Sequence, residues 1–378
     1  MVARSRMGGP WSRAQRVARA FQDADHEVIL AWGDDGNCAD PIAPTLEIPV
    51  PSPLGLPDAI ARHTFPLASR LGLMGRKPVR SFEEVLWLTG ALDERYTRAA
   101  VDTLRAHMRT ARPDVVYSEF SLAAVIAARA EGIPCVGSGS QPTTAAYASD
   151  PRKSGGIRRL LYDMGMPAPA SSLTVLEGMR RRFIPSCPTL EPRVGERAVY
   201  CGFLDEPPAL SATPRDCALV YLGAGSVPAG VTVRAGRELA RALGCDVYVA
   251  GVPEATQVSG GHTVTCAPRF DVADFLPRAR VFVHHGGQNS MMDALSHEVP
   301  QLIVPGRVFE RQFNAEAVEN ARCGLTVHAP KPALIARAAR RIVVDEPALT
   351  SGIRGLREEL TSLGGAARIV REVEQLIG

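Results

Sequence analysis

The chain has 378 residues, 46% of them hydrophobic, and a formal net charge of +3. This length predicts two domains with a core each. The charge is too small, and the basic residues are too scattered, to indicate a nucleic-acid partner. No apolar run reaches the length of a membrane span and the N-terminus has no secretion signal, so we expect a cytoplasmic protein that does not associate with membranes. The eight cysteines lack metal spacing, which predicts reduced packing residues.

The first half of the chain alternates helix and strand patterns. Apolar residues at helical spacing predict a helix that follows a capping box formed by Ser12 and Gln15. Residues 26–31 are predicted to form the strand after it. Residues 113–120 predict another strand, followed by an Ala-rich helix and a further strand within residues 132–140. This alternation is typical of a parallel sheet.

The second half begins after a Pro-rich linker over residues 206–216. Residues 217–226 predict a strand that ends in a glycine turn. The spacing Gly223-x-Gly225 is similar to the start of a dinucleotide-binding fingerprint, but proline occupies the position of the third glycine. This departure argues against an NAD-dependent enzyme.

The segment over residues 279–315 is the most informative part of the chain. A buried-strand pattern ends at the pair Gly286 and Gly287, and Asn289 and Ser290 follow at the beginning of a predicted helix. Glycines let the backbone approach a phosphate, and the free N–H groups of a first helical turn point at it with the positive end of the helix dipole. The pattern therefore predicts an anion site.

Polar side chains extend this anion site. His285, Asn289 and Ser290 offer side-chain donors. Asp293 lies one helical turn beyond Ser290, on the same face of the helix, where a carboxylate can accept from ribose hydroxyls. Phosphate donors together with a ribose acceptor predict a site for a nucleoside diphosphate.

The segment resembles the donor-site signature of GT-B glycosyltransferases of the UDP-glycosyltransferase and antibiotic natural-product glycosyltransferase superfamily. The family pattern is V-x-H-G-G-x-N/G-S/T-x-x-E-A-L-x-x-G-V-P-x-L-x-x-P, followed by D/E-Q-x-x-N-A. This chain has Asp293 in place of the usual Glu, and Glu298 where Gly is common. The doubled His284 and His285 are most similar to the actinobacterial natural-product branch.

The resemblance implies an α/β protein of the GT-B type, with two Rossmann-like doubly wound domains facing across a cleft. We expect an N-terminal acceptor-binding domain over residues 1–205 and, after the linker, a C-terminal nucleotide-sugar-binding domain over residues 217–358. Residues 359–378 are then the C-terminal helix that crosses back to the N-terminal domain. Residues 51–92 and 141–180 are expected to form variable loops over the acceptor cleft.

The resemblance also implies the donor-site residues. Gly225 and Ser226 lie beside the diphosphate, Arg269 stands in the base pocket, and Glu310 and Arg311 stand where the family has an acid and a glutamine that bind the donor sugar. The predicted donor site comprises Gly225, Ser226, Arg269, His285, Gly286, Gly287, Gln288, Asn289, Ser290, Asp293, Glu310 and Arg311.

Two of these residues bear on the identity of the donor. Asp293 favours UDP or another ribonucleotide over TDP, since it needs ribose hydroxyls to bind. Arg311 indicates an acidic or phosphorylated donor sugar, or is simply a solvated arginine. We expect no cofactor and no metal, because the chain has no D-x-D pair in a donor position and Asp34 and Asp35 lie in a Gly-flanked turn. Preorganised N–H groups and His285 would then stabilise the leaving diphosphate.

The acceptor side departs from the family pattern. Inverting members use a histidine in the loop after the first strand as general base, oriented by an Asp after a later strand. Alignment from His26 places Pro10 at the position of that histidine, in an acceptor-side loop with Trp11 and Ser12. Residues 2–7 also make a poor central strand.

The orienting Asp has a counterpart in Glu119, which is our catalytic candidate. An unpaired carboxylate in a cleft is a substitute base if its pKa is raised, or binds a cationic acceptor; it is alternatively a strand-end Glu that reaches solvent. His63 and His107 stand in no recognisable motif and are expected at the surface.

Together these features predict a metal-independent, inverting glycosyltransferase of the hexosyltransferase type that acts on a small natural-product acceptor in bacterial specialised metabolism. The missing histidine indicates an S- or N-nucleophile, or Glu119 as the base. A catalytically silent relative that binds nucleotide or a partner enzyme stays open. So does a transferase for a lipid-linked acceptor, because residues 71–80 mix apolar and basic side chains as a surface anchor does. A homodimer is also left open.

Overall fold

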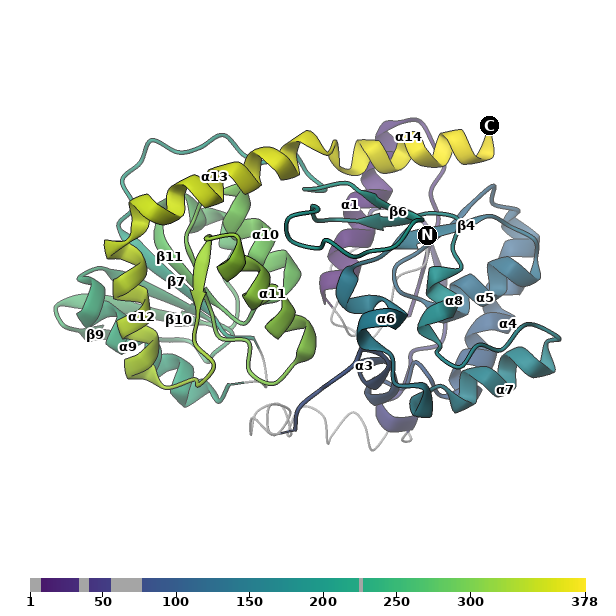
Figure 1. The fold of residues 1–378 in the computed structure, drawn as a ribbon, viewed down its shortest axis with the longest axis horizontal. Helices are drawn as coiled ribbons and strands as arrows, with labels where there is room; N and C mark the ends of the chain where they lie inside the picture. The colour runs from purple at the N-terminus through teal and green to yellow at the C-terminus, as the bar shows by residue number, and fades with distance from the viewer. Residues whose placement is uncertain (1–7, 34–40, 56–76, 224–226) are drawn as a thin grey trace. The chain divides into compact units, whose positions relative to one another are not determined.

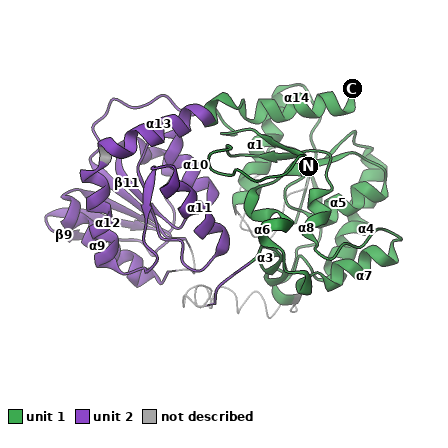
Figure 2. Ribbon diagram, in the orientation of Figure 1, with its two compact units in different colours: residues 1–61, 81–206, 360–378 green, residues 62–80, 207–359 purple. Residues whose placement is uncertain are grey.

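The computed structural model describes residues 8–33, 41–55, 77–223 and 227–378 (Figure 1). These residues divide into two compact units (Figure 2). Of the described residues, unit 1 contains 8–33, 41–55, 81–206 and 360–378, and unit 2 contains 77–80, 207–223 and 227–359.

The segment 77–80 departs from the expected domain scheme, which placed it in the N-terminal domain. It groups with unit 2 because Val79 forms a parallel bridge with Val308. The backbone N–H of Val79 donates to the carbonyl of Arg307 at 2.9 Å, and the N–H of Phe309 donates to the carbonyl of Val79 at 3.0 Å. Residues 71–76 of the basic and apolar segment lie outside the described residues.

Unit 2 is built on a seven-stranded sheet with the strand order β13-β12-β11-β7-β8-β10-β9. Neighbouring strands are parallel except for the antiparallel pair β9 and β10. The strands are β7 (Cys217–Tyr221), β8 (Asp246–Ala250), β9 (Ala255–Ser259), β10 (His262–Ala267), β11 (Ala279–His284), β12 (Gln301–Ile303) and β13 (Gly324–Thr326). The doubly wound sheet that the resemblance implies for this half is confirmed.

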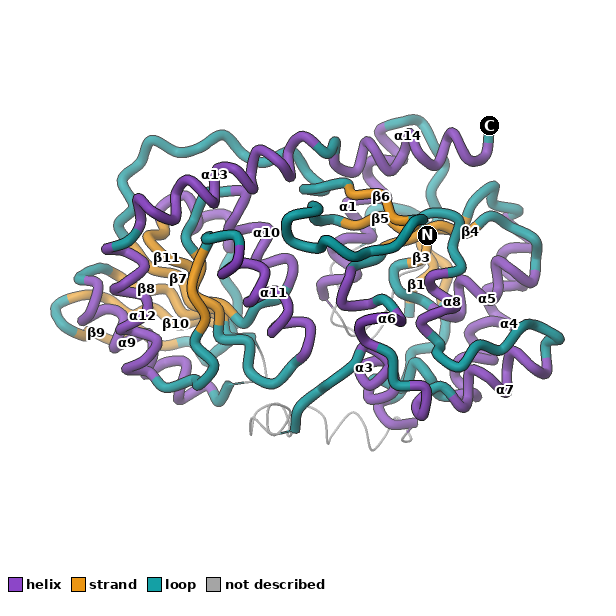
Figure 3. The backbone as a smooth tube through the Cα atoms, in the orientation of Figure 1, coloured by secondary structure: helices purple, strands orange, loops and turns teal. Residues whose placement is uncertain are grey.

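Helices cover both faces of this sheet (Figure 3). They are α9 (Ala229–Leu243), α10 (Gln288–Ser296), α11 (Phe309–Asn320), α12 (Pro332–Val344) and α13 (Glu346–Ser362), with short 3₁₀ helices η5 (Val272–Asp274) and η6 (Leu276–Arg278). On one face, α9 and α12 bury Leu239 and Ile335 against Val247 and Val281. On the other face, α10 packs against Phe282. Strands buried on both faces are typical of a doubly wound fold.

Unit 1 contains the parallel four-stranded sheet β3-β4-β5-β6 and the parallel pair β1-β2. The strands are β1 (Leu30–Trp32), β2 (Thr45–Glu47), β3 (Val116–Ser118), β4 (Cys135–Ser138), β5 (Arg182–Ile184) and β6 (Ala198–Tyr200). The helices are α1 (Gly8–Asp23), α3 (Phe82–Leu88), α4 (Glu94–Ala111), α5 (Leu122–Ala130), α6 (Ala145–Ala148), α7 (Gly155–Asp163), α8 (Leu173–Glu177) and α14 (Gly365–Ile377), with the 3₁₀ helices η1 (Pro53–Gly55), η3 (Gln141–Thr143) and η4 (Pro151–Lys153).

The core of unit 1 joins distant parts of the chain. Helix α14 buries Ile369 and Val373 against Val17 of α1 and against Tyr117 and Phe183 of the sheet. No helix of the described chain is both long and apolar enough to cross a membrane. The seven cysteines within the described ranges are free and buried, as packing residues are.

Two local predictions for the first elements are wrong. Helix α1 begins at Gly8, so Ser12 lies inside it rather than at its N-cap, and the side-chain oxygen of Gln15 accepts from the backbone N–H of Ile42 at 2.9 Å. Pro10 does not delay the helix, since the N–H groups of a first turn have no helical partner. The strand predicted over residues 26–31 is limited to Leu30–Trp32, because its partner β2 has three residues.

Candidate functional site

The strand order of unit 2 reverses between β7 and β11. From β7 the chain proceeds to β8 and β10 on one side, and then returns to β11 on the other. In doubly wound sheets, ligands bind beyond the carboxyl ends of the strands at such a reversal. These ends are Tyr221 and His284, which are paired in register, and Gly223 and Gly286 follow them. The fold therefore places a ligand site where the sequence predicts a phosphate-binding turn.

Each glycine of this turn has a steric reason. Gly286 has a φ of +83°, and a Cβ there would lie 2.9 Å from Cγ2 of Ile303 and 3.0 Å from the carbonyl oxygen of Arg311. Gly287 is the N-cap of α10, and a Cβ there would lie 2.6 Å from Nε2 of His285. The helix predicted after the glycines is present. Its first residues are the predicted site residues Gln288, Asn289 and Ser290, all partly exposed.

Two residues that the sequence did not assign hold the turn in place. The N–H of Gly286 donates to Nδ1 of His284 at 3.1 Å, so Nε2 of this imidazole carries the proton and donates to the side-chain oxygen of Gln301 at 2.9 Å. Burial lowers the pKa of His284 to about 4. The side-chain amide of Asn314 donates to the carbonyl of Gly286 at 2.8 Å. His284 is the first of the paired histidines and Asn314 is the final Asn of the family pattern, so the sequence contained a signal for each of them.

His285 is a neutral imidazole at this turn. Its Nδ1 lies 3.4 Å from the carbonyl oxygen of Tyr221, and its ring packs edge-on against the Tyr221 ring at 5.2 Å. Because a carbonyl only accepts, Nδ1 carries the proton and Nε2 is an acceptor. Burial, and then the charge of Arg311, lower the pKa of His285 to about 3. The predicted donation from His285 to a phosphate requires the other tautomer.

The remaining donor-site candidates are distributed around this turn. Glu310 and Arg311 lie in the first turn of α11, and Asp293 lies in α10; all three are partly exposed. Arg269 is exposed beyond the end of β10. The predicted residues 225–226 lie outside the described residues, as do residues 34–35.

Sequence comparisons find relatives through the second half of the chain. The family described as "Erythromycin biosynthesis protein CIII-like, C-terminal domain" matches residues 253–376. NDP-glycosyltransferase YjiC of Bacillus subtilis (strain 168) is 30% identical over 104 residues, which cover 27% of this chain and 26% of the relative. Elloramycin glycosyltransferase ElmGT of Streptomyces olivaceus is 31% identical over 107 residues, which cover 28% of this chain and 26% of the relative. The matched segment thus spans about a quarter of these curated relatives.

Solved structures extend the likeness to the whole chain. The glycotransferase of kitacinnamycin has a TM-score of 0.70 at 20% identity, over 99% of this chain and 97% of that chain. Glycosyltransferase VinC, in complex with dTDP, has a TM-score of 0.66 at 17% identity, over 100% of this chain and 98% of that chain. This likeness shows that the chain has the GT-B fold. Its GT-B fold agrees with the prediction from the donor-site signature.

In this GT-B chain, the catalytic candidate Glu119 is not the unpaired carboxylate that we expected. Its side chain is fully buried, and Nε of Arg13 donates to its Oε1 at 2.7 Å. The hydroxyl of Ser138 donates to its other oxygen, and Ser138 lies 2.9 Å from the hydroxyl of Tyr117. Burial raises the pKa of Glu119, and the charge of Arg13 acts against that shift. Glu119 is thus one member of a buried polar network.

The predicted acceptor-side loop is also different. Pro10, Trp11 and Ser12 lie in α1 rather than in a loop, and Trp11 is buried in a stack on Trp32 with ring centroids 4.5 Å apart. His107 is at the surface, 3.3 Å from the carbonyl of Glu47, as expected. His63 lies outside the described residues.

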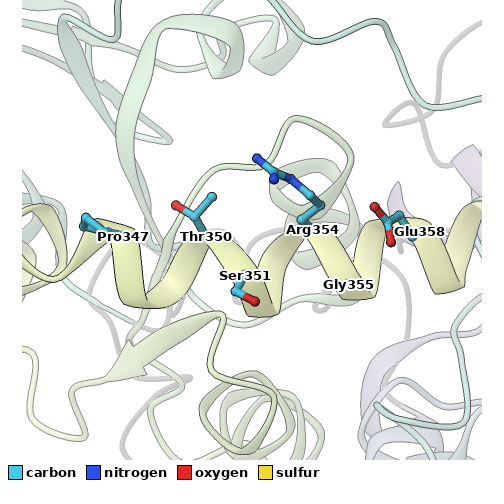
Figure 4. Close-up of a pocket in the computed structure, with 6 residues that line it drawn as sticks. All are labelled: Pro347, Thr350, Ser351, Arg354, Gly355 and Glu358. Carbon is cyan, nitrogen blue, oxygen red and sulfur yellow. The ribbon is translucent and has the colours of Figure 1, made fainter.

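A surface pocket lies elsewhere, along α13 (Figure 4). Its lining comes from one helix: Pro347, Thr350, Ser351, Arg354, Gly355 and Glu358. Since ligand sites combine polar groups from several elements, we assign no function to it. Nowhere in the described ranges do three His, Cys, Asp or Glu side chains gather as ligands of a metal ion.

Proposed function

We propose that this chain is an inverting, metal-independent glycosyltransferase that moves a sugar from a nucleoside-diphosphate sugar to a small natural-product acceptor. The observation that carries the proposal is the turn at Gly286 and Gly287. It follows β11 at the strand reversal, is held by His284 and Asn314, and opens directly into α10. Free N–H groups at such a helix start bind phosphate. Relatives named for antibiotic glycosyl transfer, and VinC with dTDP, support this assignment.

The proposed reaction is a single displacement. The acceptor atom bonds to the anomeric carbon of the sugar as the bond from that carbon to the diphosphate oxygen breaks. The electron pair leaves on the diphosphate, and the acceptor proton passes to solvent. Attack on the face opposite the leaving group inverts the anomeric configuration, which NMR of the product measures. N–H groups already aimed at the diphosphate stabilise its growing charge.

A sulfur or nitrogen acceptor is the nucleophile that fits unit 1. A general base must be within hydrogen-bond reach of the proton that it removes. Glu119 is fully buried and bonded to Arg13 and Ser138, so its oxygens are engaged inside the protein. A thiol or an amine is already nucleophilic near neutral pH and needs no such base. We therefore propose an acceptor of this kind.

The donor nucleotide is proposed to be UDP or another ribonucleotide. This rests on Asp293, a residue of α10, whose carboxylate we expect to accept from ribose hydroxyls. VinC, by contrast, is in complex with a deoxyribonucleotide. Tighter binding of UDP than of TDP, with the difference reduced in Asp293→Asn, is the expected result; equal affinities would remove the preference.

The donor site is tested by the double variant Asn289→Ala with Ser290→Ala. Each lost charge-assisted hydrogen bond is expected to weaken binding of UDP or TDP by about 1.5–3 kcal/mol. Isothermal titration calorimetry measures the loss. Ser296→Ala, at the other end of α10, is the matched control and should bind as the native chain does. Unchanged affinity in the double variant would contradict the assignment.

A catalytically silent nucleotide-binding relative is the second candidate. Pro10 at the position of the family histidine, and the engagement of Glu119 by Arg13, favour it. Release of UDP from a UDP-sugar without acceptor, or product with a thiol or amine acceptor, separates the two candidates. Turnover is expected to persist in EDTA; a loss that Mg²⁺ or Mn²⁺ restores would contradict metal independence.

A further inference from the structure

Arg311 lies directly against the glycine turn of unit 2. A Cβ built on Gly286 would lie 3.0 Å from the carbonyl oxygen of Arg311 and 3.4 Å from its Cβ. Its charge acts on two residues at the strand ends, His285 and Tyr221. The guanidinium is therefore close to the carboxyl ends of β7 and β11, where the donor diphosphate is proposed to bind.

Two features of its position favour an anion beside Arg311. It is the third residue of α11, which begins at Phe309. The first turn of a helix carries a positive partial charge that disfavours a cation. Partial burial also removes water from the guanidinium, and this lowers the pKa of Arg311. The charge of Glu310 acts against this shift. A bound phosphate adds further negative charge beside the guanidinium and replaces the lost water.

The histidine at the turn does not supply this charge. His285 is neutral, with a pKa of about 3, and its Nδ1 proton is directed at the carbonyl of Tyr221. Its Nε2 is then an acceptor, as a phosphate oxygen is. A guanidinium has only donors and binds phosphate oxygens in pairs.

We propose that Arg311 binds the diphosphate of the donor and donates to its outer phosphate as the sugar leaves. This inference rests on the proposed function and adds a residue to it. The family glutamine at this position binds sugar hydroxyls, whereas an arginine beside Gly286 is placed to hold the leaving group. It stabilises the charge that develops when the anomeric carbon–oxygen bond breaks.

The test compares Arg311→Gln, Arg311→Lys and the native chain. Arg337→Gln is the matched control, since Arg337 is exposed on α12 away from the turn. Titration calorimetry with UDP, TDP and UMP measures affinity. Arg311→Gln is expected to weaken UDP and TDP about 10- to 100-fold, as loss of a charge-assisted bond does. UMP affinity should be unchanged, Arg311→Lys should recover part of the loss, and Arg337→Gln should bind normally.

The melting temperature without nucleotide distinguishes this role from a structural one. Removal of a cation from the first turn of α11 should leave the melting temperature of Arg311→Gln unchanged or raise it. A lowered melting temperature with equal losses of UDP and UMP would mean that Arg311 only supports the turn, and would overturn the proposal. UDP-glucuronate is titrated as a fourth ligand. Normal binding of UDP by Arg311→Gln together with weakened binding of UDP-glucuronate would also overturn the proposal, since Arg311 would then bind the sugar carboxylate.

The inference and the proposed function fail in different ways. If the Asn289→Ala, Ser290→Ala variant loses UDP while Arg311→Gln binds it normally, the role of Arg311 is overturned and the donor site stands. If the native chain binds no nucleoside diphosphate, the proposed function falls and the role of Arg311 falls with it.

Discussion

The ion pair of Arg13 and Glu119 is the residue-scale feature that most affects the interpretation of the acceptor side. A buried pair brings little net stability, but removal of one partner leaves an uncompensated buried charge. Glu119 is fully buried, and the side chain of Arg13 is 9% exposed. Arg13 also lies over the ring of Phe120, at 5.6 Å. The pair thus joins α1 to the loop after β3.

Glu119→Gln is expected to destabilise the protein by about 3–5 kcal/mol, because Arg13 stays buried without its counter-charge. Urea unfolding measures the loss. Glu94→Gln, which breaks two ion pairs at the surface, is the matched control and should cost much less. The pH profile of kcat should be the same in the folded variant as in the native enzyme, with no limb near the pKa of a carboxylate lost. A limb that is present in the native enzyme and vanishes in the variant would make Glu119 the base.

At the scale of elements, the segment β11–turn–α10 forms the proposed donor site. The left-handed backbone at Gly286 turns the chain from strand into helix, and the packing of Ile303 and Arg311 leaves no room for a side chain there. Nearby, Gly306 also has a positive φ, +64°, but nothing lies within 4 Å of a Cβ built on it. A comparison of alanine variants at these two glycines therefore separates the cost of backbone strain from the cost of a steric clash.

Gly306→Ala is expected to cost about 1–2 kcal/mol of stability through backbone strain alone, and to bind UDP or TDP normally. Gly286→Ala should cost more and should lose nucleotide binding, because the added Cβ displaces the turn. Urea unfolding and titration calorimetry measure both effects. Equal stability losses and equal affinities for the two variants would show that space at Gly286 does not matter.

At the scale of the whole molecule, unit 2 contains a source of acid sensitivity. His284 is completely buried as a neutral imidazole with a pKa of about 4, below its ordinary value of 6.5. The unfolded chain therefore binds this proton more readily than the folded one. The contribution of neutral His284 to the free energy of unfolding is complete above about pH 6.5. It falls by roughly 3 kcal/mol as the pH decreases towards about 4. Protonation of Nδ1 also breaks its bond from Gly286.

His284→Asn tests this acid sensitivity, since an amide oxygen can accept from Gly286 but does not titrate. The variant will be less stable at neutral pH, because Gln301 loses its partner. The difference in unfolding free energy between the native chain and His284→Asn should shrink by roughly 3 kcal/mol as the pH falls from about 6.5 to about 4. Urea unfolding at a series of pH values measures it. A constant difference would contradict the prediction.

Local sequence predicted two central strands of unit 2 and the helix after the second. The apolar runs at β7 and β11 indicate buried parallel strands. Gly286 and Gly287 are informative because few other residues allow this backbone and this approach. Ser12 shows the limit of such rules, since a capping residue inside a helix looks the same in sequence as one at its start.

The sequence by itself therefore determined the two doubly wound halves and the strand–glycine–helix donor turn, because period, glycine and capping are local properties of a few neighbouring residues. Tertiary structure alone decided which polar groups meet. Arg13 reaches Glu119 across 106 positions, and Asn314 reaches Gly286 across 28. Hydrophobic patterns specify which face of an element is buried, but the polar partner on that face depends on how the elements pack. For that reason Glu119 seemed an unpaired carboxylate in the sequence and is a buried ion-pair partner in the fold.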